Sequence, residues 1–195
     1  MSMRGWSGSV KQLAVAGALS ALMAGCGFQL RGAPPVSSAL QPLAVACTSG
    51  VPDTLCQAVR EQLKLGQVQL TDRENADYIL RISDFESDRR ASAITAQAAA
   101  AEYTLRHAVD LEVVTADGVP LVANTRLNTT ESYRYDETNV LAKQREEEAL
   151  SQQMDDRLAQ QIIFRLAPLT SGRIEALRQD YQNSQTSDPT STDKP

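Results

Sequence analysis

The sequence predicts an α+β protein, a two-layer α/β sandwich in which two helices pack on one face of a mixed, mostly antiparallel sheet. Three patterns indicate this fold. A short apolar run precedes an amphipathic helical segment, two long segments alternate polar with apolar residues, and a long stretch with an apolar residue at every fourth position follows them. Two helices in this order cover one face of a sheet most economically, which leaves the other face polar.

The first two predicted elements are a strand and a helix. The run "LAVAC", Leu43–Cys47, is short and apolar, as expected for a covered strand. A helix is expected at Thr54–Leu65 because Leu55, Val59 and Leu63 fall on one of its faces. Asp53 stands at the N-cap position and Gly66 at the C-cap position of this helix.

Long strands and a long helix are expected in the second half. Alternation predicts strands at 77–83, 102–114 and 121–135, and Asp117-Gly118 is a hairpin signal between the last two. A helix is expected from near Asn139 to Ala167, before Pro168. One stripe of this helix is apolar and should face the core: Leu150, Met154, Leu158, Ile162 and Leu166.

The amino-terminal segment indicates export and lipidation. Residues 1–25 carry two basic residues ahead of a short apolar run, as a signal peptide does, and the run is too short and too rich in alanine and glycine for a membrane anchor. The segment "LMAGC" resembles a lipobox, which makes Cys26 the acylated residue; the alternative is a conventional signal with a chance cysteine. Gly27 after that cysteine implies delivery to the outer membrane, and 26–41 is expected to be a tether.

The remaining cysteines and the charge balance limit the function classes. Cys47 and Cys56 either form a disulfide in the oxidising exterior or remain two buried thiols, and the sequence leaves both states open. Removing residues 1–25 leaves 17 basic against 24 acidic residues, so nucleic acid is not expected as a partner.

No enzyme, metal or cofactor site is predicted. The single histidine, His107, lies among apolar residues of its strand, which favours a core histidine with a satisfied hydrogen bond over a general base. One histidine and two spare cysteines give no zinc spacing, and no phosphate-binding glycine loop occurs. Acidic residues at 146–148 and 155–156 are expected to lie on a solvated helix face.

The domain is expected to span 42–170, followed by a largely disordered extension at 171–195. Within that extension 171–182 is compatible with a last helix or an unpacked tail, and the polar segment 183–195 is expected to be disordered. The polar sheet face is compatible with contact to water, and equally with contact to the polar interior of a membrane barrel.

Several segments together resemble one family. They are "GCGFQLRG" at 25–32, "AVREQL" at 58–63, "AEYTL" at 101–105, "YRYDETNVLAKQREEEAL" at 133–150 and "AQQIIFRL" at 159–166. This chain is similar in these segments to the LPS-assembly lipoprotein LptE family. The resemblance covers nearly the whole chain after Cys26 except its tail, and the lipobox and the tyrosine-rich strand are its most specific parts.

The resemblance implies a domain that plugs and helps assemble the LptD outer-membrane β-barrel and takes part in lipopolysaccharide insertion into the outer leaflet. It also implies lipopolysaccharide contact through Lys143 in "VLAK", for which the alternative is a solvated lysine paired with Glu147. The second basic position that the family carries, before "AEY", is absent here, and Arg89 and Arg90 are the candidate substitutes. A free-standing periplasmic lipid carrier is the alternative function.

Overall fold

The structure is a computed structural model that describes residues 36–96 and 100–186. All of them belong to one compact unit, Ala33–Pro195. The predicted signal peptide at 1–25, the predicted lipidation of Cys26 and the last part of the predicted tail, 187–195, lie outside the described residues.

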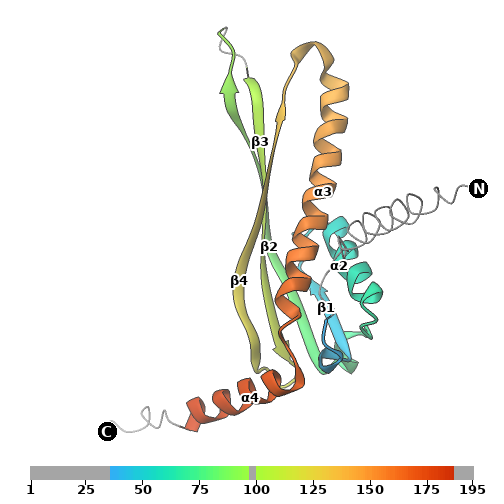
Figure 1. Ribbon diagram of the computed structural model, residues 1–195, viewed down its shortest axis with the longest axis vertical. Helices are drawn as coiled ribbons and strands as arrows, with labels where there is room; N and C mark the ends of the chain where they lie inside the picture. Colours follow the sequence, from blue (N-terminus) through green and yellow to red (C-terminus); the bar gives the residue numbers. More distant parts are fainter. Residues whose placement is uncertain (1–35, 97–99, 187–195) are drawn as a thin grey trace, which may run out of the picture. The chain divides into compact units, whose positions relative to one another are not determined.

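The sheet has four strands in the order β1-β2-β3-β4, and three of them are long (Figure 1). The strands are β1 (Leu43–Cys47), β2 (Tyr78–Ile94), β3 (Ala100–Thr115) and β4 (Pro120–Arg134). β1 pairs with β2 in parallel, whereas β2 with β3 and β3 with β4 are antiparallel. The predicted mixed, mostly antiparallel sheet is confirmed, and the turn between β3 and β4 contains Gly118 with φ 87° as the hairpin signal required.

Within the described residues three α-helices accompany the sheet: α2 (Asp53–Leu65), α3 (Val140–Leu166) and α4 (Ser171–Thr186). Short 3-10 turns occur at Ser38–Leu40, Arg73–Asn75 and Glu137–Asn139. The helices α2 and α3 lie against one face of the sheet, called the inner face here, and the α+β prediction is confirmed (Figure 1). The opposite face is called the outer face; Ile79 and Val114 are buried at one end of it, and beyond them it carries mostly exposed polar side chains.

The core is formed between the inner face and these two helices. Strand residues such as Leu80, Ile82 and Leu111 are fully buried against Leu63 of α2 and Leu166 of α3. The predicted stripe of α3 is confirmed, because its last four apolar residues have no exposed surface. Burying a leucine or isoleucine side chain contributes about 1.5–3 kcal/mol, so this stripe holds α3 on the sheet.

The strand β2 extends well beyond the predicted 77–83 because a bulge interrupts its alternation. The pairing register shifts between Ser83 and Glu86, and Asp84 has a left-handed backbone with φ 50°. A bulge adds an unpaired residue, so the side chains beyond it change faces and the two-residue period is lost although the pairing continues.

The predicted start of the first helix and the predicted limits of the domain need correction. Pro52, not Asp53, is the N-cap of α2, and Asp53 is the first helical residue, where its carboxylate still interacts favourably with the helix dipole. Val36 and Leu40 belong to the buried core, so the packed domain begins before residue 42. Residues 36–41 are therefore part of the domain and not of a tether.

The prediction of a largely disordered extension is wrong for 171–186, which form α4. Ile174 is buried in the main core cluster, and Leu177 packs against it. Arg178 also bonds Asp117 in the β3–β4 turn at 3.2 Å. Apolar contacts on one face of a short, mostly polar segment are enough to order it on an existing core.

A buried polar network joins α2, β3 and α3. Asp155 Oδ1 lies 3.0 Å from His107 Nδ1, and the hydroxyl of Thr54 donates to Asp155 Oδ2 at 2.6 Å. His107 is 5% exposed and its ring meets Phe85 edge-on, so the predicted core histidine is confirmed. The prediction that Asp155 lies on a solvated face is wrong: it is 6% exposed, because a neighbouring strand supplies the partner that a buried carboxylate needs.

Replacing Asp155 should therefore cost far more stability than replacing its neighbour. Asp155→Ala leaves His107 and Thr54 buried without their partner, and we expect the free energy of unfolding to fall by roughly 2–3 kcal/mol in urea titrations. Asp156→Ala, at an exposed position of the same turn, is the control and should change it by less than about 0.5 kcal/mol. Equal losses in the two variants would contradict a buried network.

Candidate functional site

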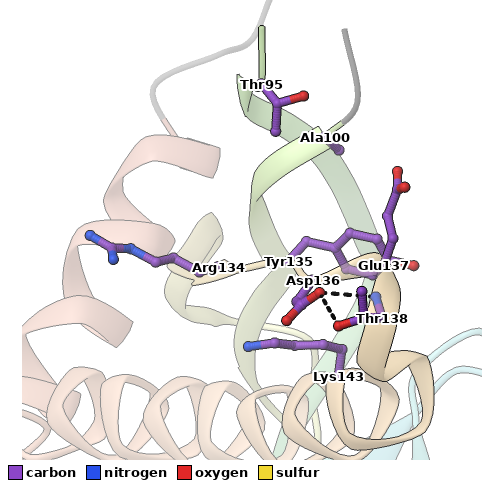
Figure 2. A pocket seen from close by; sticks show the side chains of 8 residues that line it. All are labelled: Thr95, Ala100, Arg134, Tyr135, Asp136, Glu137, Thr138 and Lys143. Carbon is purple, nitrogen blue, oxygen red and sulfur yellow. Dashed lines mark hydrogen bonds between the residues drawn. The ribbon is translucent and has the colours of Figure 1, made fainter. Parts of the chain in front are cut away.

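A hollow lies at the end of the sheet where β4 leads into α3 (Figure 2). Its volume is about 640 Å³, and it is open to solvent. We call it the distal hollow; it is lined by Thr95, Ala100, Arg134, Tyr135, Asp136, Glu137, Thr138 and Lys143. Lys143, the residue that the sequence indicates for lipopolysaccharide contact, is thus at a concave surface.

A rigid turn places Lys143 there. The carboxylate of Asp136 accepts hydrogen bonds from the backbone N–H and the hydroxyl of Thr138, at 2.9 and 2.7 Å (Figure 2). These hydrogen bonds lower the pKa of Asp136, which caps the 3-10 turn before α3. Because α3 begins at Val140, its first turn presents Lys143 to the hollow.

The charges of the distal hollow are balanced. Lys143 Nζ donates to Glu146 at 2.7 Å, so its partner on the helix is one residue earlier than the predicted Glu147. Asp136 and Glu137 also line the hollow, together with the two cations Arg134 and Lys143. An anion that binds Lys143 here shares its ammonium with the carboxylate of Glu146 or displaces that carboxylate.

Arg89 is held in a cluster on the inner face of the sheet. Its guanidinium lies 3.9 Å from the ring centroid of Tyr103 and 3.2 Å from a carboxylate oxygen of Glu147. Tyr135 packs edge-on against Tyr103, and the hydroxyl of Tyr133 donates to Glu147 at 2.5 Å. We call these five residues the arginine–tyrosine cluster; it attaches the first half of α3 to β2, β3 and β4.

Burial and the carboxylate of Glu147 shift the pKa values of Tyr133 and Arg89 in the cluster. Burial raises the pKa of Tyr133, and the hydrogen bond to Glu147 with the charge of that carboxylate raises it further. Burial opposes the charge of Arg89, but the contact with Tyr103 and the charge of Glu147 outweigh it and raise its pKa. Arg89 is therefore a structural cation whose charge is already neutralised.

The structure separates the three cations that the sequence suggested for lipopolysaccharide. Neighbours along a strand point to opposite faces, so Arg89 lies on the inner face and Arg90 on the outer face. Arg90 pairs with Asp88 and its side chain is 79% exposed. Lys143 is near the cluster only through its helix, because Glu147 lies one turn after it. They do not form one binding site.

The two remaining cysteines are joined in the structure. Cys47 at the end of β1 and Cys56 in the first turns of α2 form a disulfide with their Cα atoms 6.5 Å apart. Of the two states that the sequence left open, the structure has the bridge. It fixes α2 to the edge strand at the end from which Thr54 reaches Asp155.

Sequence reasoning missed Tyr133, Arg134 and Glu147 as site residues. A signal is present in the sequence: Tyr103, Tyr133 and Tyr135 stand at the apolar positions of the two alternating segments. Tyr103 lies opposite Tyr133, and this pairing depends on the register of β3 and β4. The hairpin signal predicts that register only where no bulge lies between the turn and the tyrosines. A bulge near Val113 does intervene, so the cluster could not be assembled from the sequence.

Replacing Glu147 tests the cluster. We expect Glu147→Gln to lower the free energy of unfolding by about 1 kcal/mol, because both charged contacts are partly exposed. The pKa of Tyr133 in the folded protein lies above the unfolded value of about 10. The hydrogen-bonded Tyr133 hydroxyl therefore contributes fully to the free energy of unfolding below pH about 10, and this contribution is lost as the pH rises through the folded pKa. The variant should lower this pKa in absorbance titrations read against Tyr133→Phe.

The adjacent Glu148 is the matched control, because it is exposed and has the same charge. Glu148→Gln should leave both the stability and the titration of Tyr133 unchanged. A pKa of Tyr133 that is equally unaffected in the Glu147 variant would contradict the cluster.

Neither a metal-binding group nor a membrane-spanning helix is found among the residues that the structure describes. No three His, Cys, Asp or Glu side chains within 36–96 and 100–186 are grouped so that they could hold a metal ion. None of the helices in the same ranges is long and apolar enough to cross a membrane.

Known proteins with a similar chain share one family. A family model described as "LptE: Lipopolysaccharide-assembly" matches residues 40–166. The chain is 31% identical over 156 residues to the LPS-assembly lipoprotein LptE of Yersinia enterocolitica, a match that covers 78% of this chain and 73% of that protein. It is 28% identical over 164 residues to the protein of that name from Photorhabdus laumondii, covering 83% and 88% respectively.

The fold is also found in a solved structure. The solution structure of an uncharacterized lipoprotein B from Nitrosomonas europaea matches with a TM-score of 0.59 and 21% identity, covering 77% of this chain and 96% of that one. The family that the sequence motifs suggested is confirmed. Because the family match spans the strands, α2 and α3 of the described domain, the chain belongs to the LptE lipopolysaccharide-assembly family.

Proposed function

We propose that this protein is a non-enzymatic lipoprotein of the outer membrane that plugs and helps assemble an LptD-type β-barrel. In this role it takes part in the insertion of lipopolysaccharide into the outer leaflet. Membership of the LptE family supports a role in lipopolysaccharide assembly. The observation that carries the finer proposal is the outer face of the sheet, which is long and, beyond its buried end at Ile79 and Val114, mostly polar and exposed.

The outer face has the chemistry of a surface that meets another polar surface. Arg81 pairs with Glu112 there, and Arg126 pairs with both Asp110 and Glu86. Between and beyond these pairs the face carries hydroxyl and amide side chains, including Thr104, Asn128, Thr130 and Ser132. The interior of a transmembrane barrel is polar, so such a face can be enclosed without burying unpaired apolar surface.

The anchor in this proposal is Cys26. With its thiol and amino group acylated, several acyl chains hold the protein firmly at the membrane, since each buried methylene contributes about 0.8 kcal/mol. The domain then faces the periplasm and the barrel lumen. Barrel contact is a second means of retention that does not depend on the acyl chains.

Lys143 is the proposed contact for a phosphate of lipopolysaccharide in the distal hollow. Its ammonium is a compact charge that suits a phosphate oxygen, and the hollow is wide enough to admit a head group. The pair with Glu146 makes this contact a competition, so binding there should be weak in the free protein and sensitive to the charge of residue 146.

The barrel partnership is tested by purification. The carboxy-terminally tagged full-length protein, purified from detergent-solubilised outer membranes, should retain one large barrel protein at equal stoichiometry in mass analysis. Stoichiometric bound phospholipid without a barrel would overturn the plug proposal and favour the free-standing lipid carrier.

The role of Lys143 is tested by charge. Lys143→Glu should weaken lipopolysaccharide binding by the mature protein about tenfold, because a cation is replaced by a repelling carboxylate, and should leave barrel retention unchanged. Glu146→Gln should strengthen binding, since it frees Lys143. Lys64→Glu, at an exposed position of α2, is the control for net charge; an equal loss in that variant would remove Lys143 from the site.

A further inference from the structure

The strand β4 forms one edge of the sheet, and this edge is open. It is the last strand in the order β1-β2-β3-β4, so only β3 pairs with it. The pairing runs without a bulge from Thr125 to Arg134, and no proline interrupts this stretch. The backbone groups of β4 that point away from β3 therefore form a regular row in the plane of the sheet, which is separate from the side chains of the outer face.

The register determines which residues form this row. The backbone N–H of Tyr135, directly after β4, donates to Ala101 O of β3 at 3.0 Å. Successive residues of an antiparallel strand direct their N–H and C=O groups to alternate sides, so the even-numbered residues direct theirs away from β3. We call these residues the β4 row: Arg126, Asn128, Thr130, Ser132 and Arg134. A contact from α3 agrees with this assignment, because Gln161 Nε2 donates to Asn128 O at 3.1 Å.

The β4 row is almost without backbone partners. Apart from the carbonyl of Asn128, none of its N–H and C=O groups has a hydrogen bond with a residue of 36–96 or 100–186, and all five residues are exposed. Sheet edges are normally protected by proline, a bulge, charged side chains or a covering segment, because unpaired backbone groups pair with other chains. The centre of the row, Asn128, Thr130 and Ser132, is uncharged and has neither proline nor bulge.

The helix α3 lies beside this edge on the inner side of the sheet. Its Arg157 pairs with Glu131 of β4, and its Gln161 reaches Asn128. Phe164 belongs to the same stripe of the helix, because it lies seven residues after Arg157 and three after Gln161. The Phe164 side chain is 55% exposed. It therefore offers an apolar contact to a side chain on the inner side of an added strand.

The charges at the two ends of the β4 row disfavour a second copy of this chain as the partner. If two copies pair antiparallel about Thr130, Arg126 of each copy lies opposite Arg134 of the other. Like charges directly opposite one another on a sheet are destabilising. Arg134 forms no ion pair with any residue that the structure describes, so this repulsion is not compensated there. A different chain with a carboxylate opposite Arg134 avoids it.

The proposed barrel limits which segment can be the partner. In a closed barrel every wall strand is paired with a neighbour on both sides, so the wall offers no edge to another sheet. A strand that adds to β4 must then come from a part of the barrel protein outside its wall, such as a loop or a terminal segment that extends into the lumen.

We propose that an extended segment of the barrel protein, from outside its wall, adds to β4 as a further strand of the sheet. Backbone hydrogen bonds to the β4 row supply the affinity, as in other cases of strand addition. A carboxylate opposite Arg134 and an apolar side chain against Phe164 supply the specificity. The proposal rests on the proposed plug function and adds a contact that does not use the outer face.

Amide hydrogen exchange distinguishes strand addition from contact through the outer face alone. Exchange is measured residue by residue for the full-length protein, alone and in its purified barrel complex, in the same detergent. We expect the N–H groups of Asn128, Thr130 and Ser132 to exchange at least about tenfold more slowly in the complex. The N–H groups of Thr129 and Glu131 face β3, should be slow in both states, and are the internal control.

A proline in the β4 row tests the same contact by substitution. Thr130→Pro removes one donor and obstructs an added strand, but it leaves the hydrogen bonds to β3 in place because the N–H of Thr130 points away from β3. Its control, Thr130→Val, keeps the N–H. We expect the proline variant to retain at least about tenfold less barrel protein in co-purification, and the valine variant to retain as much as the unmodified protein.

A second pair of variants tests the helix side of the edge. Phe164→Ser should also reduce barrel retention, whereas Leu65→Ser, at an exposed apolar position of α2, should not. Urea titrations of all four variants show whether each one is folded. If Thr130→Pro is unfolded, the exchange measurement and the Phe164 pair decide the question.

The possible outcomes separate this proposal from the proposed function. If the barrel is retained but the amides of the β4 row exchange equally fast in both states, strand addition is wrong and the plug proposal stands. Unchanged retention in a folded Thr130→Pro variant has the same meaning. A complex with two copies of this chain would assign the edge to self-pairing. If the unmodified protein retains no barrel, both proposals fail.

Discussion

The structure depends on a mismatch of length between the sheet and its apolar core. The strands β2, β3 and β4 have 17, 16 and 15 residues, whereas the fully buried stripe of α3 begins only at Met154, halfway along that helix. Strands of this length stay ordered beyond the core only if a face is packed or specific side-chain pairs hold them. Beyond the main core, a small apolar cluster of Leu105, Tyr133 and Met154 attaches α3 to the sheet, and polar contacts add to it.

Two acidic residues of α3 provide that attachment at different heights. Asp155 holds His107 of β3 and Thr54 of α2 within the buried part of the domain. Glu147, two turns earlier, holds Arg89 of β2 and Tyr133 of β4 in the arginine–tyrosine cluster. Polar contacts of this kind are directional, so they fix the height and rotation of α3 on the sheet, which apolar packing alone does less strictly.

The same arrangement separates structural from available charge. Arg89 is held by the arginine–tyrosine cluster. Arg81 and Arg126 of the outer face are held in ion pairs. Three further cations, Arg106, Arg134 and Lys143, lie beyond the buried core; the first two form no ion pair with a described residue, and Lys143 pairs only with the exposed Glu146. A surface held by a few polar contacts is also the part of a domain that can most readily adjust to a partner.

The sequence by itself determined the fold class, the family and most of the elements, because these depend on local patterns. The four-residue stripe of α3 and the alternation of β3 are repeated over several turns or residue pairs, so they persist without knowledge of the neighbours. The lipobox and the tyrosine-rich segment around "YRYDETNVLAK" were specific enough to indicate the LptE family, which the family match confirms. The stripe, the alternation and the family motifs can all be recognised within short stretches of the chain.

Only the tertiary structure decided which side chains meet. β2 continues through the bulge at Asp84 to Ile94, eleven residues past its predicted end. Because the bulge changes the face of the side chains that follow, Arg89 faces the helices and Arg90 faces away from them. In the sequence Asp155 resembles a solvated acid. In the structure it is bonded to His107 of β3 and Thr54 of α2. In the same way α4 is ordered by a core that its own sequence does not contain. Contacts between residues distant in the chain depend on register and packing, which local patterns do not encode.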